Sequence, residues 1–112
     1  MERLISVIMP AYNEGERIFE NIRTTIDVLN NAGLNSEIIA IDDGSSDNTL
    51  SEISRAAETF ENVIAASNPS NMGKGMALKN GFGHSTGEIV VFMDADLDLH
   101  PSQIHNLIAK LD

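Results

Sequence analysis

Residues 4–31 read LISVIMPAYNEGERIFENIRTTIDVLNN, and this stretch predicts a strand followed by a helix. The β-branched run Leu4–Met9 is short and stops at Pro10. In the segment Glu14–Asn31 the apolar residues fall on one helical stripe, which consists of Ile18, Phe19, Ile22, Ile26 and Leu29. Strands that are apolar rather than alternating are covered on both faces, which is typical of a parallel sheet between helices.

The same unit of strand and helix recurs along the rest of the chain. Further strands are expected at Glu37–Ile41, Val63–Ala66 and Ile89–Met93. Further helices are expected from Ser46 or Asp47 to about Phe60, over Met72–Phe82, and from Pro101 onward. Because parallel strands are joined by right-handed crossovers, the pattern predicts one α/β domain with a doubly wound, mostly parallel sheet in a three-layer α/β/α arrangement.

Composition argues against several classes of protein. The 112 residues carry a formal net charge of −10, which repels the phosphates of nucleic acids and of anionic membrane surfaces. Without cysteine the chain has no disulfide framework and no thiolate metal site. Its apolar runs are far shorter than the roughly 18 residues that a membrane span needs, and Met1–Met9 lacks the features of a signal peptide. We therefore expect a soluble, cytoplasmic protein.

Polar residues follow each of the four expected strands. They lie in four segments: Pro10–Asn13, Asp42–Ser45, Ser67–Asn71 and Asp94–Asp96. In doubly wound sheets, ligands bind in the crevice at the carboxyl ends of the strands. The sequence therefore predicts a ligand site at this edge of the sheet.

Three carboxylates come directly after the fourth strand, at Asp94, Asp96 and Asp98. In extended chain, residues two apart point to the same side, so these groups converge and need a cation among them. Oxygen ligands alone select a hard divalent ion, so Mg²⁺ or Mn²⁺ is the expected cofactor. The alternative is that Asp96 or Asp98 is a solvated turn residue before Pro101. His100 is either a further ligand or, as we favour, a helix cap.

Two other motifs at this edge allow both a structural and a binding role. Asp42 and Asp43 lead into a turn, but their carboxylates could also accept hydrogen bonds from a base or a ribose. Asp47 is expected to be a helix cap rather than a ligand. The segment Asn71–Gly75 opens a helix whose N-terminus favours anions, and Lys74 would add a positive charge beside a diphosphate. The glycines here, with Gly81, could equally allow the helix to pack close to the sheet.

Tyr12 is the only tyrosine of the chain, and it follows the first expected strand. Its ring could stack on a nucleobase, or it could be a partly exposed packing residue.

Taken together, the motifs resemble those of the family 2 glycosyltransferases. They occur in the order Ser6–Glu14, Ile41–Thr49, Asn71–Ala77 and Phe92–Leu97. The resemblance is strongest to the dolichyl-phosphate mannose synthases and the related polyprenyl-phosphate glycosyltransferases. It implies a GT-A fold, the Rossmann-like fold of nucleotide-diphospho-sugar transferases.

The resemblance also implies roles for individual residues. Pro10, Tyr12 and Glu14 would line the base and ribose pocket. Asp42 or Asp43 would bond the base, and Lys74 would approach the phosphates. Asp94 and Asp96 would form the metal motif, with Asp96 the firmer ligand and Asp94 closer to the ribose; Asp98 stands where the mannose synthases usually carry glutamine.

The activity implied by the resemblance is the metal-dependent transfer of a sugar, with inversion, from a GDP- or UDP-linked donor to an acceptor such as polyprenyl phosphate. Residues 1–112 would be the N-terminal, donor-binding portion of such an enzyme. The catalytic base of the family lies beyond the metal motif, so no residue of this chain is assigned that role, and the chain alone is expected to be inactive. The full enzyme would act in the cytoplasm or at the cytoplasmic face of the membrane.

Two alternatives belong to other classes of protein. Length, acidity and strand pattern also fit a receiver-type signalling module, although the acidic pair after the first strand and the phosphoacceptor aspartate after the third are missing. The chain could also be a nucleotide-binding or oligomerising fragment without turnover. The apolar run Ile89–Met93 would then be an exposed sheet edge through which copies of the chain associate.

Overall fold

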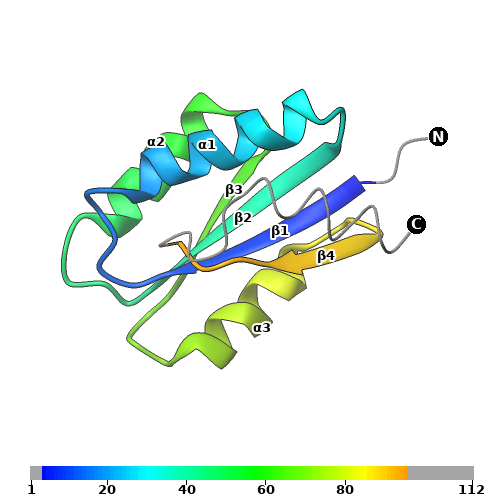
Figure 1. The fold of residues 1–112 in the computed structure, drawn as a ribbon. Helices are drawn as coiled ribbons and strands as arrows, with labels where there is room; N and C mark the ends of the chain where they lie inside the picture. Colours follow the sequence, from blue (N-terminus) through cyan, green and yellow to red (C-terminus); the bar gives the residue numbers. More distant parts are fainter. Residues whose placement is uncertain (1–3, 96–112) are drawn as a thin grey trace.

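The computed structural model describes residues 4–95, which form four strands and three helices (Figure 1). In chain order the elements are β1 (Leu4–Ala11), α1 (Ile18–Asn31), β2 (Asn35–Asp43), α2 (Thr49–Thr59), β3 (Val63–Asn68), α3 (Lys74–His84) and β4 (Ile89–Phe92). The helix expected from Pro101, together with Asp96, Asp98 and His100, lies outside the described residues. None of the three helices is long and apolar enough to cross a membrane.

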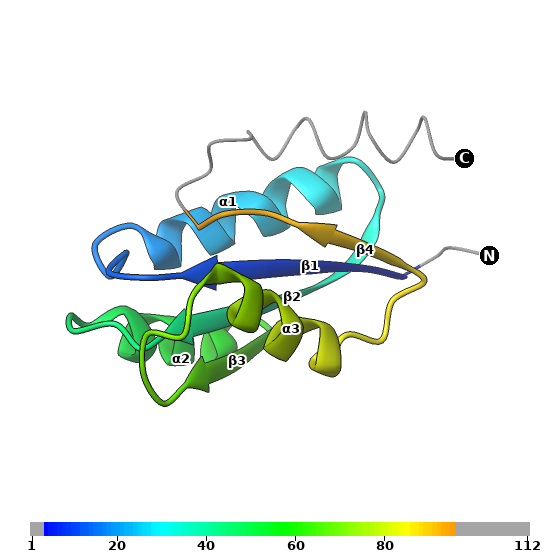
Figure 2. The ribbon, with the colours of Figure 1, turned by 90° about the horizontal axis from the view of Figure 1, so that it is seen from below.

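The four strands form one sheet in the order β3-β2-β1-β4, and every neighbouring pair is parallel. Helices α1 and α2 cover one face of this sheet, and α3 covers the other (Figures 1 and 2). The chain steps outward from β1 through β2 to β3 and then returns to the far side of β1, so the direction of winding changes between β1 and β4. The expected doubly wound α/β/α fold is thus confirmed, and its switch point lies at β1.

Apolar side chains leave the sheet on both faces, as the uninterrupted apolar strands predicted. On the face under α1 and α2, Val7 and Met9 are fully buried in the larger core. On the opposite face, Ile8 and Ile41 pack with Ala77 of α3. Full burial of an aliphatic side chain contributes about 1.5–3 kcal/mol, so both layers hold the strands in place and give the edge of the sheet a rigid base.

Strands β1 and β2 are longer than the sequence predicted, and Pro10 does not end its strand. Pro10 pairs with Ile41 of β2, and pairing continues to Ala11 and Asp42. The carbonyl of Pro10 accepts a hydrogen bond from the Ala95 N–H on the β4 side. Because the N–H and C=O of one strand residue point the same way, the donor that proline lacks faces β4, whose regular pairing stops two residues earlier at Ile8.

The packing role expected of the glycines in α3 is confirmed for Gly81 but not for Gly73. A Cβ atom on Gly81 would lie 2.4 Å from Cγ2 of Ile8 and 2.6 Å from Cδ1 of Ile41, so the helix rests directly on the sheet. A Cβ atom on Gly73 would meet nothing within 4 Å. Gly73 instead has a φ of 92°, which only glycine adopts readily, and it turns the chain into α3.

Candidate functional site

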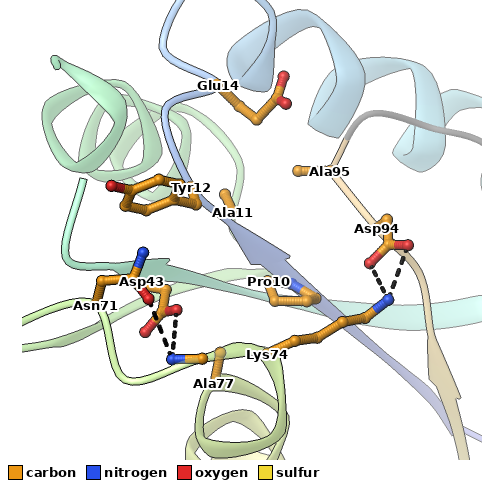
Figure 3. Close-up of a pocket in the computed structure, with 11 residues that line it drawn as sticks. Pro10, Ala11, Tyr12, Glu14, Asp43, Asn71, Lys74, Ala77, Asp94 and Ala95 are labelled. Carbon is orange, nitrogen blue, oxygen red and sulfur yellow. Dashed lines mark hydrogen bonds and ion pairs between the residues drawn. The ribbon is translucent and has the colours of Figure 1, made fainter. Parts of the chain in front are cut away.

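A cavity of about 380 Å³ opens at the carboxyl ends of the strands (Figure 3). Six of the residues selected from the sequence line it: Pro10, Tyr12, Glu14, Asp43, Lys74 and Asp94. Asn71 and Gly73 from the loop before α3 complete the polar lining, and the small side chains of Ala11, Ala77 and Ala95 leave the space open. The cavity therefore lies beside the switch point, where the topology favours a ligand.

Lys74 and Asp94 form an ion pair at the cavity (Figure 3). The Lys74 Nζ atom lies 2.7 Å from Oδ1 and 2.9 Å from Oδ2 of Asp94. Lys74 is the first residue of α3, whereas Asp94 follows the end of β4, so the pair joins two elements. Both side chains are well exposed, at 61% and 39%, and a pair of this kind contributes only about 0–1 kcal/mol to stability. Its charges are thus available to a ligand at little cost to the fold.

Asp94 is the part of the expected metal site that the structure describes. Within residues 4–95 no three His, Cys, Asp or Glu side chains come close enough to hold a metal ion. The Asp94 carboxylate lines the cavity and offers the hard oxygen ligand that Mg²⁺ or Mn²⁺ prefers, so the residue fits such an ion. Asp96 and Asp98 lie outside the described residues.

Asp42 and Asp43 separate to opposite faces of the sheet. Asp43 lines the cavity on the α3 side, whereas Asp42 does not line it. The Oδ1 atom of Asp42 accepts a hydrogen bond of 3.1 Å from the Ser45 N–H and so stabilises the turn. The two residues differ because β2 runs through both of them and successive strand residues alternate in direction.

Asp43 is buried and accepts three hydrogen bonds. Its Oδ1 atom accepts from the Asn68 side-chain amide at 2.9 Å and from the Met72 N–H at 3.0 Å. Its Oδ2 atom accepts from the Gly73 N–H at 3.0 Å. Burial is the largest single effect on the pKa of Asp43 and raises it, but the three hydrogen bonds together lower the pKa below its usual value. Asp43 is therefore a carboxylate held in its charged form by the neighbouring loop.

Tyr12 and Glu14 occupy the loop after β1. The Tyr12 side chain is about half exposed at the cavity, so its ring is accessible to a planar ligand. The Glu14 carboxylate forms an ion pair of 2.7 Å with Arg17. The Glu14 backbone N–H donates to the Thr49 hydroxyl at 2.9 Å, which ties this loop to the start of α2.

Side chains that the sequence did not assign to the site connect the loop after β1 with the loop after β2. The Asn13 N–H donates to the Ser45 hydroxyl at 2.8 Å, and the Asn13 side-chain oxygen accepts from the Ser46 N–H at 3.0 Å. The Gly15 N–H donates to Asp47 at 3.0 Å. Asn13 has a φ of 53°, which asparagine tolerates better than most residues. The sequence shows an asparagine in the loop after the first strand and serines in the loop after the second, but only the fold shows that these residues form hydrogen bonds with each other.

The N-cap of α2 is Asn48, and not Ser46 or Asp47 as the sequence predicted, but Asp47 still binds the first N–H of the helix. Helix α2 has Asn48 at its N-cap, without a side-chain capping bond. The Asp47 carboxylate instead accepts hydrogen bonds from the N–H and the hydroxyl of Thr49. The bond from the Thr49 hydroxyl is the main reason that the pKa of Asp47 is lowered.

Comparison with known proteins identifies the class. The sequence model of the family described as Glycosyl transferase family 2 matches residues 6–112, so this chain belongs to that family. The match confirms the family expected from the motifs and favours it over a receiver module.

Individual relatives are consistent with this assignment. The chain is 41% identical over 109 residues to an undecaprenyl-phosphate 4-deoxy-4-formamido-L-arabinose transferase of Enterobacter sp. (strain 638). The alignment covers 96% of this chain and 33% of the relative. A mannosyltransferase from Pyrobaculum calidifontis, solved in complex with GDP-Man and Mn²⁺, superposes with a TM-score of 0.78 at 30% identity, over 96% of this chain and 32% of that one.

A second solved structure, the glucosyl-3-phosphoglycerate synthase of Mycobacterium tuberculosis in complex with Mn²⁺, UDP and phosphoglyceric acid, gives a TM-score of 0.74 at 32% identity. The alignment covers 97% of this chain and 39% of that one. This chain therefore spans between about a third and two fifths of the length of these relatives.

Proposed function

We propose that this chain binds the nucleoside diphosphate sugar of a family 2 glycosyltransferase, and that the whole protein transfers the sugar to a polyprenyl phosphate. The observation that carries the proposal is the pairing of Lys74 with Asp94 at the switch-point cavity. One side chain supplies a cation for a diphosphate and the other an oxygen ligand for a divalent ion. The solved relatives with GDP-Man or UDP, and the relative named for undecaprenyl phosphate, support the donor and the acceptor class.

The donor would lie along the cavity with its two ends recognised differently. The exposed ring of Tyr12, with Pro10 and Glu14 beside it, would receive the base and ribose. Lys74 and the N-terminus of α3 would receive the diphosphate, because helix N-termini favour anions.

A divalent ion would be held by Asp94, with Asp96 and Asp98 as the further ligands expected from the sequence. When bound there, Mg²⁺ or Mn²⁺ would neutralise the negative charge that develops on the leaving diphosphate. Lys74 would add its own charge to the same group.

The transfer would be an inverting displacement. An acceptor oxygen would attack the anomeric carbon opposite the diphosphate, and the carbon–oxygen bond to the diphosphate would break with the electron pair leaving on the diphosphate. A phosphate acceptor is already anionic and needs no base to deprotonate it. Since a polyprenyl phosphate is a membrane lipid, the reaction would take place at a face of the membrane, and the cytoplasmic face is the one expected from the sequence.

Calorimetry with UDP and GDP, each with and without Mn²⁺, tests donor binding. We expect one of the two nucleotides to bind, more tightly when Mn²⁺ is present. Asp96→Ala should abolish the part of the affinity that depends on Mn²⁺. If the affinity of this variant for the nucleotide were unchanged in Mn²⁺, the metal assignment would be wrong.

The role of Lys74 has a matched control on the same helix. Lys74→Gln should weaken diphosphate binding about tenfold or more, because a charge-assisted contact is lost. Lys79 is exposed on α3 and does not line the cavity, so Lys79→Gln should leave the affinity unchanged. Thermal unfolding should be similar for both variants and the parent chain. Equal affinities for the two variants would contradict the proposed contact.

A further inference from the structure

We propose that Asp47 is a positioning residue for the nucleoside part of the donor, because it anchors the loop after β1 that carries Tyr12 and Glu14 to the cavity. This inference rests on the proposed function, which assigns the base and ribose to these two side chains. Asp47 does not itself line the cavity, so it would act on the donor only through the loop. The role goes beyond the helix cap that the sequence predicted.

The first support is a set of hydrogen bonds between two loops. Three consecutive N–H groups of the loop after β1, at positions 13–15, each donate to a side chain of the segment 45–49. At 2.8, 2.9 and 3.0 Å respectively, the donor–acceptor pairs are Asn13 with Ser45, Glu14 with Thr49, and Gly15 with Asp47. Since loop N–H groups lack the regular partners of a helix or strand, these side chains satisfy them and fix the path of the loop.

Asp47 controls two of these three hydrogen bonds. Its Oδ2 atom accepts the Gly15 N–H directly, and its Oδ1 atom accepts both the N–H and the hydroxyl of Thr49. A hydroxyl group has one hydrogen and two lone pairs. Because the hydrogen of the Thr49 hydroxyl is directed to Asp47, a lone pair of the same oxygen is free to accept the Glu14 N–H. Thr49 is fully buried, which protects this arrangement from water.

The second support is close packing at Gly15 and does not depend on hydrogen bonds. A Cβ atom on Gly15 would lie 1.9 Å from Oδ1 of Asn48 and 3.1 Å from Oδ2 of Asp47. The loop backbone therefore lies directly against the side chains that precede α2. A larger residue at this position would have to displace Asn48 to keep its N–H at the carboxylate.

The position of Tyr12 follows from the backbone on both sides of it. On one side, Ala11 is paired with Asp42 in the sheet. On the other, Asn13 is held through its N–H and through its side-chain oxygen, which accepts the Ser46 N–H at 3.0 Å. The Tyr12 ring lies at the cavity between these two fixed points (Figure 3).

This arrangement predicts a selective effect on donor binding. Release of the loop at Glu14 and Gly15 would loosen the base and ribose end of the site, where small displacements are costly. The diphosphate end would keep its affinity, because Lys74 belongs to α3, which covers the opposite face of the sheet from α2. A residue that only stabilised the fold would affect both ends alike.

The first measurement needs no ligand. Hydrogen exchange followed by NMR should show the Glu14 and Gly15 amides exchanging at least about tenfold faster in Asp47→Asn than in the parent chain. Asparagine has one acceptor oxygen in place of two. The control is Glu52→Gln, because Glu52 is also acidic and near the start of α2, but its carboxylate pairs with Arg55. It should leave both amides protected, and unchanged exchange in Asp47→Asn would overturn the proposal.

The fluorescence of Tyr12 gives a second measurement without ligand. The chain has one tyrosine and no tryptophan, so emission excited beyond the absorption of phenylalanine comes from Tyr12 alone. In Asp47→Asn this emission should have a lower anisotropy and be quenched more strongly by acrylamide, because the ring is less restrained. Glu52→Gln should match the parent chain. Equal anisotropy and quenching in Asp47→Asn and the parent would contradict the positioning role.

Calorimetry then separates the two ends of the donor. The ligands are the nucleoside diphosphate that the parent chain binds, UDP or GDP, and inorganic pyrophosphate, each with Mn²⁺. Asp47→Asn should weaken binding of the nucleotide about fivefold or more and change pyrophosphate binding less than about twofold. Equal losses for both ligands would reduce Asp47 to a structural residue and refute the inference.

A second pair of variants serves if Asp47→Asn does not fold. Thr49→Val removes the hydroxyl that holds the Glu14 N–H but keeps the volume and the Asp47 carboxylate, whereas Thr49→Ser keeps the hydroxyl. Only Thr49→Val should speed exchange at Glu14 and weaken nucleotide binding. Identical behaviour of the two variants would count against the proposal.

The outcomes also distinguish this inference from the proposed function. If the parent chain binds neither UDP nor GDP, the proposed function fails, while hydrogen exchange and Tyr12 fluorescence still decide whether Asp47 anchors the loop. If the parent chain binds a nucleotide and Asp47→Asn binds it equally well, the proposed function stands and this inference fails.

Discussion

Gly33 and Gly44 have nearly the same backbone torsion, with φ of 75° and 71°, but different surroundings. A Cβ atom on Gly33 would meet nothing within 4 Å, whereas one on Gly44 would collide with the backbone of Ser70 and Asn71. We expect Gly33→Ala to cost about 1 kcal/mol of stability for the torsion alone. Gly44→Ala should cost about 1–3 kcal/mol more, because the loop must move. Urea unfolding of both variants measures the difference, and equal losses would show that the loop does not pack on Gly44.

Single residues of the site were predictable where their chemistry alone marked them. Lys74 is a charged residue at the start of an expected helix, Asp94 directly follows an expected strand, and both line the cavity. The sequence did not distinguish Asp42 from Asp43. The predicted strand stopped at Ile41, so no face of the sheet could be assigned to either side chain. Once β2 is seen to include both, strand alternation assigns Asp43 to the cavity. The hydrogen bonds from the side chain of Asn68 to Asp43 and from the side chain of Asn80 in α3 to Asn68 join separate elements, so no local pattern predicts them.

At the scale of elements, the order of strands and helices followed from the apolar pattern, whereas several ends did not. Strand β1 continues through Pro10 because the N–H that proline lacks would point toward β4, so the pairing of β1 with β2 is not interrupted. Helix α3 begins at Lys74, two residues later than expected, because Gly73 takes a positive φ and Asp43 binds its N–H. The end of β1 and the start of α3 are therefore determined by contacts with neighbouring elements, and a local sequence pattern contains no information about those contacts.

The close approach of α3 to the sheet gives a prediction at this scale. Gly81→Ala should destabilise the chain by about 1–3 kcal/mol, because its methyl group would displace Ile8 and Ile41 from a packed core. Gly83 is also in α3, but a Cβ atom there would meet nothing within 4 Å. Gly83→Ala should therefore stabilise the chain by up to about 1 kcal/mol through helix propensity. Chemical denaturation of the two variants checks the opposite signs, and a stabilising Gly81→Ala would contradict the packing.

At the scale of the whole molecule, the topology explains why residues far apart in sequence meet. The change of winding at β1 opens the sheet edge between β1 and β4, so the loop after β1, the loop before α3 and the end of β4 surround one cavity. A net charge of −10 makes a placed cation such as Lys74 valuable, since the rest of the chain repels an anionic ligand. The proposed donor site would therefore be local, and a metal ion would contribute much of its positive charge.

The arrangement of the sheet also leads to a prediction about assembly. In the described part of the chain, β4 pairs with β1 alone and forms one edge of the sheet, and the Phe92 side chain is 53% exposed there. Since an apolar edge strand invites pairing, we expect copies of this chain to associate through β4. Light scattering should give a mass that rises with concentration, more so at high salt, which screens the acidic surfaces.

A substitution at the edge locates this association. Phe92→Lys should shift the chain toward the monomer, because a lysine on an edge strand opposes pairing with another copy. Leu50 is similarly exposed, at 40%, but lies on α2, which packs against β2 and β3 rather than β4. Leu50→Lys adds the same charge and should leave the association unchanged. If the parent chain stays monomeric at high concentration, or if both variants dissociate equally, the edge of β4 is not the contact.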